Sequence, residues 1–125
     1  MILDTNALSA AADEDRGVIA VLSQANEIAL PVVVLGEYRY GMSESRNRNR
    51  YEAWLRGFLA DCAVLEISER TTHFYAAIHV ELKRMGRPIP TNDMWIAALG
   101  RQHSLPIVSR DHHFDLVKEC KRIDW

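Results

Sequence analysis

The chain begins with Met1-Ile2-Leu3-Asp4-Thr5-Asn6, the stretch that says most about its fold. Two apolar residues run directly into an acidic residue, and two helix-capping residue types and the helix-forming run 7–12 follow it. The pattern predicts a short buried strand whose carboxyl end delivers Asp4, with Thr5 or Asn6 capping the next helix. Ligands of open parallel sheets bind at the carboxyl ends of the strands, so Asp4 is the first candidate for chemistry. Taken alone, Asp4 fits a simple helix N-cap slightly better than a functional acid.

Length and composition predict one compact domain that spans residues 1–125. A chain of this length with 48% apolar residues can bury one sizeable core, and it leaves no room for a second domain. It contains no run of 18 apolar residues, and its first residues lack the charged and long apolar regions of a signal peptide. We therefore expect a cytoplasmic protein with no membrane partner.

Cysteine usage and net charge exclude some classes of site. Cys62 and Cys120 lie far apart without a Cys-x-x-Cys spacing, which indicates neither a zinc site nor a disulfide framework. The net charge of -2 argues against a broadly basic nucleic-acid-binding protein. This net charge does not exclude a local basic face around an acidic site.

Strand-like and helix-like patterns alternate along the chain. Apolar runs predict strands at 28–30, 63–67 and 105–109, and residues 123–125 are a candidate edge strand. Helical periodicity and capping residues predict helices over 18–25, 32–42, 51–59, 68–85 and 92–99, and one helical turn over 112–117. Gly86 supplies a stop for the longest helix, and Thr91 is a candidate cap for the helix that follows it.

Four acids stand at special positions in this pattern. Asp4 and Asp111 close predicted strands, Asp93 opens a helix, and Glu37 lies in the first turns of another. The neighbours of Glu37, which include Tyr40, are mostly apolar or small, so we expect its side chain on a mostly buried face. Two carboxylates about 4 Å apart repel by roughly 4 kcal/mol at an effective dielectric constant of 20, so such a cluster needs a cation. Without a cysteine or histidine ligand set, the expected ion is Mg²⁺ or Mn²⁺.

These acids and their neighbours carry a family resemblance. The matching motifs are Leu3-Asp4-Thr5-Asn6, Leu35-Gly36-Glu37 with Tyr40-Gly41, Asn92-Asp93 with Ile96-Ala97, and Ser109-Arg110-Asp111 with Phe114. In order and spacing the whole chain resembles the PIN domain, and most of all the small stand-alone VapC-type ribonuclease toxins of toxin–antitoxin operons. The resemblance implies an α/β/α sandwich around a central parallel sheet of about five strands.

The resemblance also implies a function. It is that of a Mg²⁺- or Mn²⁺-dependent endoribonuclease that cleaves single-stranded RNA segments and acts as the toxin of a toxin–antitoxin pair. Carried over residue by residue, the catalytic and metal-binding acids are Asp4, Glu37, Asp93 and Asp111. Asp4 and Asp93 are the expected direct ligands, while Glu37 and Asp111 would bind through water or hold a second ion.

Other residues take supporting roles in this interpretation. Thr5, Asn6 and Ser109 would orient a carboxylate or a bound water. Asp115 could replace or assist Asp111, because family members vary in which acid of this stretch approaches the metal. The first strand, at about three residues, is short for the family.

The resemblance further implies a homodimer and a cognate small antitoxin protein. Trp54 belongs to a helix that is rich in bulky apolar residues, and we expect it at the edge of a groove for a partner. The alternative is that these aromatic residues are all internal core. Arg46, Arg48 and Arg50 form the only concentrated positive charge, which we interpret as a solvated connection or an exposed helix start. A contact of these arginines with RNA phosphates or with the partner is the competing interpretation.

Rival functions leave features of the sequence unexplained. A metal-free ribonuclease could use His112 or His113 beside Asp111 as its general base. A catalytically inert PIN-like or receiver-like domain would use the acids only to bind Mg²⁺ or a partner. A phosphate-accepting receiver needs an acidic pair after the first strand and a later lysine, and haloacid dehalogenase phosphatases need Asp-x-Asp, where this chain has Asn6. Neither of these two rivals accounts for Glu37.

Overall fold

A five-stranded parallel sheet forms the centre of the computed structural model, which describes residues 1–125. The strands are β1 (Ile2–Leu3), β2 (Ile28–Pro31), β3 (Cys62–Leu65), β4 (Ile107–Val108) and β5 (Arg122–Ile123). Their order in the sheet is β3-β2-β1-β4-β5, and every neighbouring pair is parallel. The chain thus reverses its direction of winding at β1, which places the carboxyl ends of β1 and β4 together at a switch point.

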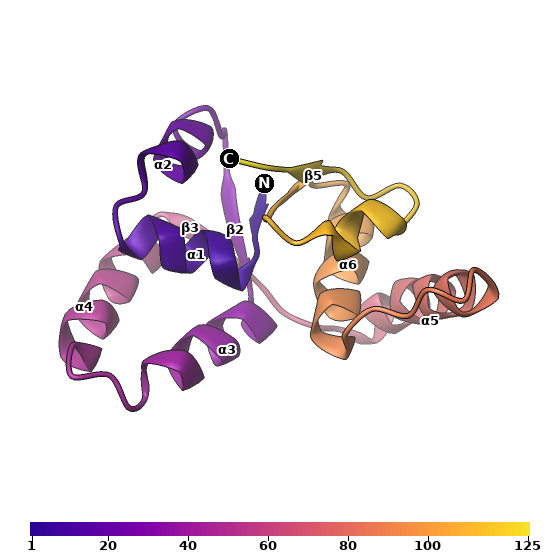
Figure 1. The fold of residues 1–125 in the computed structure, drawn as a ribbon, viewed down its shortest axis with the longest axis horizontal. Coiled ribbons are helices and arrows are strands. Elements are labelled where there is room, and N and C mark those ends of the chain that lie inside the picture. The colour runs from indigo at the N-terminus through magenta and orange to yellow at the C-terminus, as the bar shows by residue number, and fades with distance from the viewer.

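Six α-helices flank the sheet and complete the expected α/β/α arrangement. They are α1 (Thr5–Ala12), α2 (Arg16–Leu22), α3 (Val32–Met42), α4 (Arg48–Leu59), α5 (Glu69–Arg84) and α6 (Thr91–His103). A short 3₁₀ helix, η1 (His112–Leu116), follows β4. Figure 1 shows α1, α3 and α4 on one side of the strands, and α5 and α6 on the other. None of these helices combines the length and apolar character needed to cross a bilayer.

Helix boundaries follow local sequence, with corrections at two N-termini. Asp4 itself caps α1, because its carboxylate accepts a hydrogen bond from the Thr5 N–H, so the expectation that Thr5 or Asn6 is the cap was wrong. At α6 the cap position is Pro90 rather than Thr91. Ser68 caps α5 as expected, and Gly86 ends that segment with a φ of +64°, a left-handed conformation that glycine adopts readily.

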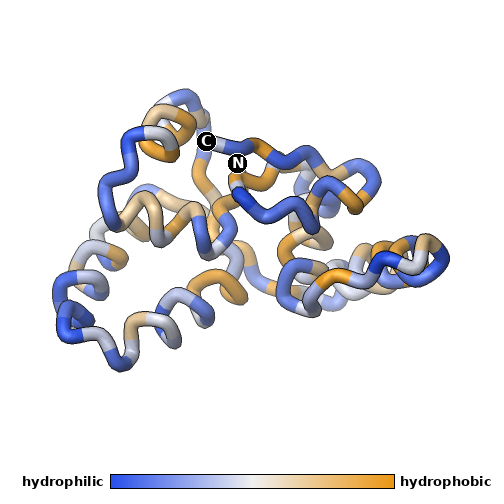
Figure 2. Tube along the Cα trace, viewed as in Figure 1, coloured by the Kyte–Doolittle hydropathy of each residue, from blue (hydrophilic) through white to orange (hydrophobic).

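The core lies on both faces of the two central strands. Ile2, Leu3, Ile107 and Val108 are fully buried, as parallel strands covered by helices on both sides should be. Figure 2 shows hydrophobic segments gathered around the strands and the helix turns that face them, with hydrophilic segments at the outer loops. One expectation for α3 was wrong, because Tyr40 is 82% exposed. The core face of α3 consists of Val34, Leu35, Tyr38 and Met42.

Strand register brings polar residues together just beyond the core. Leu3 pairs with Val108 in the β1–β4 ladder, so Asp4 and Ser109 follow at the same edge of the sheet. Pro31 ends β2 and α3 begins directly after it, which carries Glu37 toward the same edge. The fold therefore collects residues from distant parts of the sequence above the carboxyl ends of the central strands.

Candidate active site

Asp4 stands at the centre of a polar network. Its Oδ2 accepts hydrogen bonds from the Ser109 hydroxyl at 2.7 Å and from the Asn6 side-chain amide at 2.6 Å, and its Oδ1 accepts one from the Thr5 N–H at 2.7 Å. Ser109 is itself fully buried and accepts a hydrogen bond from the Asp111 N–H at 2.9 Å. The network fixes the orientation of Asp4 and ties it to the segment that carries Asp111.

Glu37 is held from two sides. The Thr5 hydroxyl donates a hydrogen bond to its Oε2, and the Asn92 amide donates one to its Oε1 at 2.6 Å. Glu37 is half-buried, which agrees in part with the buried face expected for it. Asn92 was not among the residues expected in the site, although it directly precedes Asp93. The missing signal was the packing of α3 against α6, which no local pattern reports.

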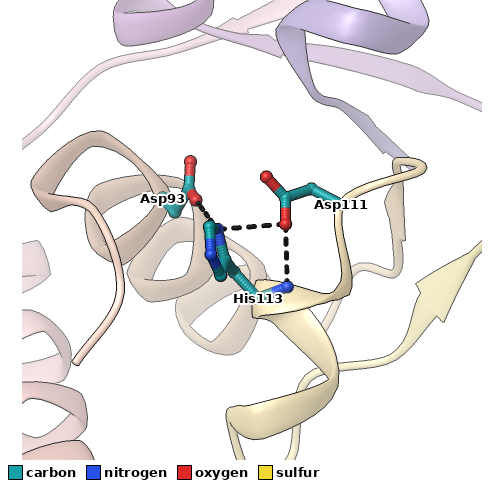
Figure 3. Close-up of side chains that lie close together, drawn as sticks. All are labelled: Asp93, Asp111 and His113. Atoms are coloured by element: carbon teal, nitrogen blue, oxygen red, sulfur yellow. Dashed lines mark hydrogen bonds and ion pairs between the residues drawn. The ribbon is translucent and has the colours of Figure 1, made fainter. Parts of the chain in front are cut away.

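Asp93 and Asp111 meet at a histidine. Asp93 lies in the first turn of α6, and Asp111 caps η1 by accepting the His113 N–H at 2.9 Å. The imidazole Nδ1 of His113 lies 2.8 Å from Asp93 Oδ2 and 3.0 Å from Asp111 Oδ1 (Figure 3). Figure 3 also shows the second oxygen of each carboxylate pointing away from the ring. His113 entered the sequence interpretation only as a rival general base, and its contact with both acids was not foreseen.

The four acids influence one another electrostatically. Burial is the main reason why the pKa of Asp4 is raised, the hydrogen bonds from Ser109 and the Thr5 N–H oppose the rise, and the charges of Glu37 and Asp111 add to it. The pKa of Asp93 is also raised, first by burial and then by the charges of Asp4 and Asp111, with the His113 contact opposing. Burial and the neighbouring carboxylates thus both disfavour the charged forms of Asp4 and Asp93.

This donor set fits a divalent cation. Asp4 is coupled electrostatically to Glu37 and Asp111, and Asp93 to Asp4 and Asp111, so the four carboxylates lie near one another, and oxygen ligands are those that Mg²⁺ and Mn²⁺ prefer. Asp93, Asp111 and His113 each offer a ligand atom within 4.8 Å of the other two. A cation among these atoms would offset both the burial and the repulsion that raise the pKa values of Asp4 and Asp93.

Asp115 is held away from this group. Its carboxylate accepts a hydrogen bond from Arg122 Nε at 2.9 Å and lies 2.9 Å from His112 Nδ1. These contacts, led by Arg122, lower its pKa, the opposite direction from that of Asp4 and Asp93. Asp111, rather than Asp115, is the acid of this stretch that the fold brings to the other three.

Arg46, Arg48 and Arg50 are exposed, as expected for a solvated connection and helix start, and nothing in their surroundings assigns them a ligand. Trp54 is half-buried and stacks on Phe58 with a ring separation of 4.8 Å. Trp54 and Phe58 line a mostly apolar hollow together with Ile19 and Leu22. Trp54 thus borders an apolar hollow, and the expectation that this hollow is a groove for a partner stays a prediction.

Comparisons with known proteins identify the family to which the sequence is similar. The family model described as "PIN domain" matches residues 1–119. The chain is 29% identical to Ribonuclease VapC2 of Rickettsia felis, over 98% of this chain and 90% of that protein. It is 30% identical to the tRNA(fMet)-specific endonuclease VapC of Shigella flexneri, over 79% of this chain and 76% of that protein.

Solved structures give the same result for the fold. The crystal structure of VapBC2 from Rickettsia felis bound to a promoter DNA fragment matches with a TM-score of 0.86 and 26% identity, covering 99% of this chain and 97% of that one. The crystal structure of FitAcB from Neisseria gonorrhoeae matches with a TM-score of 0.84 and 25% identity, covering 98% of this chain and 95% of that one.

Proposed function

The chain belongs to the PIN domain family, and on that premise we propose that it is a Mg²⁺- or Mn²⁺-dependent endoribonuclease that hydrolyses phosphodiester bonds in single-stranded segments of RNA. The observation that carries the proposal is the gathering of Asp4, Glu37, Asp93 and Asp111 above the carboxyl ends of the central strands, where burial and the neighbouring charges raise the pKa values of Asp4 and Asp93. The names of the VapC relatives, which are a ribonuclease and a tRNA endonuclease, support RNA as the substrate.

The acids would hold the cation, with Asp4 and Asp93 as direct ligands and Glu37 and Asp111 nearby. A bound ion would stabilise the negative charge that builds up on the phosphate oxygens and would make a water molecule more acidic. The protein's own contribution is orientation. Ser109 and Asn6 donate to Asp4, while Thr5 and Asn92 donate to Glu37, so both carboxylates are fixed before substrate arrives.

We further propose that the protein is the toxin of a toxin–antitoxin pair and forms a homodimer. Its structural relatives include VapBC and FitAB assemblies, one of them a member of the VapBC family of toxin-antitoxin systems. The apolar hollow beside Trp54 is the surface we assign to a small antitoxin partner. Arg46, Arg48 and Arg50 are exposed and free to meet RNA phosphates or that partner.

Cleavage of a labelled single-stranded RNA by the purified chain tests the catalytic proposal. Cleavage with Mg²⁺ or Mn²⁺, its loss in EDTA and its return on addition of the metal are the expected results. Cleavage that persists in EDTA would favour a histidine mechanism. A folded chain that binds the metal without cutting RNA would favour the catalytically inert, metal-binding alternative.

Expression in a bacterial host tests the biological role separately. We expect growth arrest by the wild-type chain, none by Asp93→Asn, and relief by a small protein encoded beside it. Unimpaired growth with abundant folded protein would contradict the toxin assignment. It would not bear on the nuclease assignment, which the RNA cleavage assay tests.

A further inference from the structure

One ring nitrogen in the acidic site faces two carboxylates. His113 Nδ1 lies 2.8 Å from Asp93 Oδ2 and 3.0 Å from Asp111 Oδ1. Figure 3 marks both contacts with dashed lines. The backbone keeps the ring there, because Asp111 caps η1 and accepts the His113 N–H two residues later. Phe114, the next residue, is fully buried and anchors the turn in the core. The ring is therefore aimed at this point by the fold.

A single N–H does not satisfy this arrangement well. One ring nitrogen carries at most one proton, so it can donate along a straight line to only one of the two oxygens. A cation between the three atoms would satisfy a lone pair on each of them. An octahedral ion with ligands at about 2.1 Å places adjacent ligand atoms roughly 3 Å apart. The two observed separations, 2.8 Å and 3.0 Å, match that spacing.

We infer that His113 Nδ1 is a direct ligand of the metal ion, together with Asp93 and Asp111, and that it makes the site favour Mn²⁺ over Mg²⁺. The inference rests on the proposed metal-dependent function and goes beyond its four acids, because it adds His113 and moves Asp111 from binding through water to direct contact with the ion. Mg²⁺ takes oxygen ligands and dehydrates reluctantly, so an imidazole contributes little to its binding. Transition-metal ions accept imidazole nitrogen, and Mn²⁺ combines this with a preference for carboxylates.

The same geometry leaves only Nε2 of His113 for a general-base role, because Nδ1 is engaged by two protein carboxylates. His112, its neighbour in sequence, points elsewhere: its Nδ1 lies 2.9 Å from Asp115, and its side chain is 79% exposed. His112 is therefore a matched control for every measurement on His113.

Pulsed electron paramagnetic resonance on the Mn²⁺-loaded full chain tests the coordination directly. We expect modulation from a directly bound ¹⁴N nucleus in the wild type and in His112→Ala, and its loss in His113→Ala. Preparing the wild type with ¹⁵N-labelled histidine should change the modulation to that of ¹⁵N, a result that needs no variant to fold. All-oxygen coordination in the wild type, or nitrogen modulation that survives in His113→Ala, would overturn the inference.

Calorimetric titration with MnCl₂ and MgCl₂ separately tests the preference. In His113→Ala we expect the Mn²⁺ dissociation constant to rise about tenfold or more and the Mg²⁺ constant to change less than about threefold. An equal change for the two ions, or no change, would contradict the proposed preference. If the wild type cleaves RNA but binds Mn²⁺ through oxygen atoms only, the ligand role of His113 is refuted and the ribonuclease proposal stands. If the wild type binds Mn²⁺ through nitrogen but cleaves no RNA, the ribonuclease proposal is refuted and the ligand role of His113 stands.

Discussion

Ser109 donates a hydrogen bond from its hydroxyl to the carboxylate of Asp4 at 2.7 Å, although 105 positions separate the two residues in the chain. The contact follows from strand register, since Leu3 pairs with Val108 and the next residue on each strand emerges at the same edge. The N–H of Asp111 donates in turn to the Ser109 hydroxyl. The first and last acids of the site are thus connected through one buried side chain, and the pairing of β1 with β4 sets the geometry between them.

Asp93→Asn should abolish metal-dependent RNA cleavage and stabilise the metal-free protein. The substitution removes a charge that burial and the neighbouring acids disfavour, as the raised pKa of Asp93 indicates, while the asparagine oxygen can still accept from His113. We expect the free energy of unfolding in EDTA to rise by about 1 kcal/mol. Thermal denaturation with and without metal measures the change. A lower melting temperature in EDTA, or full activity, would refute the crowded acidic site.

Asp115→Asn should leave metal binding and RNA cleavage close to wild type. Its carboxylate is engaged by Arg122 and His112, away from the other acids. Cleavage assays and calorimetric titration with MnCl₂, run beside Asp93→Asn and Asp111→Asn, make the comparison. A loss as large as that in Asp111→Asn would mean that Asp115 joins the site during catalysis.

Asn92→Ala should lower the rate of RNA cleavage by about ten- to a hundredfold with little loss of stability. The amide of Asn92 donates to Glu37 Oε1, and losing a hydrogen bond that orients a site carboxylate has effects of that size. Asn49→Ala is the control, because Asn49 is an exposed asparagine on α4. A rate equal to that of the Asn49 variant would show that Glu37 does not depend on Asn92.

Glu81→Gln should destabilise the protein at neutral pH but not in acid. Arg101 donates two hydrogen bonds to Glu81, at 3.1 and 2.9 Å, and ties α5 to α6. This pairing lowers the pKa of Glu81 from its ordinary value of 4.5. A lowered folded-state pKa contributes stability that is present above the unfolded value and is lost as the pH falls through the folded value.

The expected cost of Glu81→Gln is therefore about 0.5–1 kcal/mol near neutral pH, because solvent screens a carboxylate that is 33% exposed, and it shrinks toward zero below the folded pKa of Glu81. Urea denaturation of both proteins across the acidic range measures it. Glu69→Gln is the matched control, because Glu69 on the same helix is 86% exposed and pairs only with His73. A cost that does not change with pH would show that packing, rather than charge, accounts for the effect.

Local patterns in the sequence predicted most of the architecture. Apolar runs ending at an acid or a hydroxyl identified β1 and β4, because a strand buried on both faces leaves an uninterrupted apolar signature. Ser68 and Gly86 bounded α5 for similarly local reasons, since caps and stops act within one helical turn. The corrections at Asp4 and Pro90 shift a cap by one residue and change no element.

Side-chain contacts between distant elements lay beyond that information. Asn92 reaches Glu37 across 55 positions only because α3 and α6 pack together. Asp111 and Asp115 were both candidates for the last acid of the site. Arg122 on β5 donates a hydrogen bond to Asp115 and holds it away from the other acids. The contact of His113 with Asp93 could not be predicted either, because it depends on how the buried Phe114 positions η1 against α6.

The sequence by itself thus determined which elements form, their order and the acids that end or begin them, because those features depend on periodicity and capping over a few neighbouring residues. Only the tertiary structure decided which polar residues hold each acid and where the imidazole of His113 points. Those relationships depend on strand register and helix packing, which act between residues far apart in the chain.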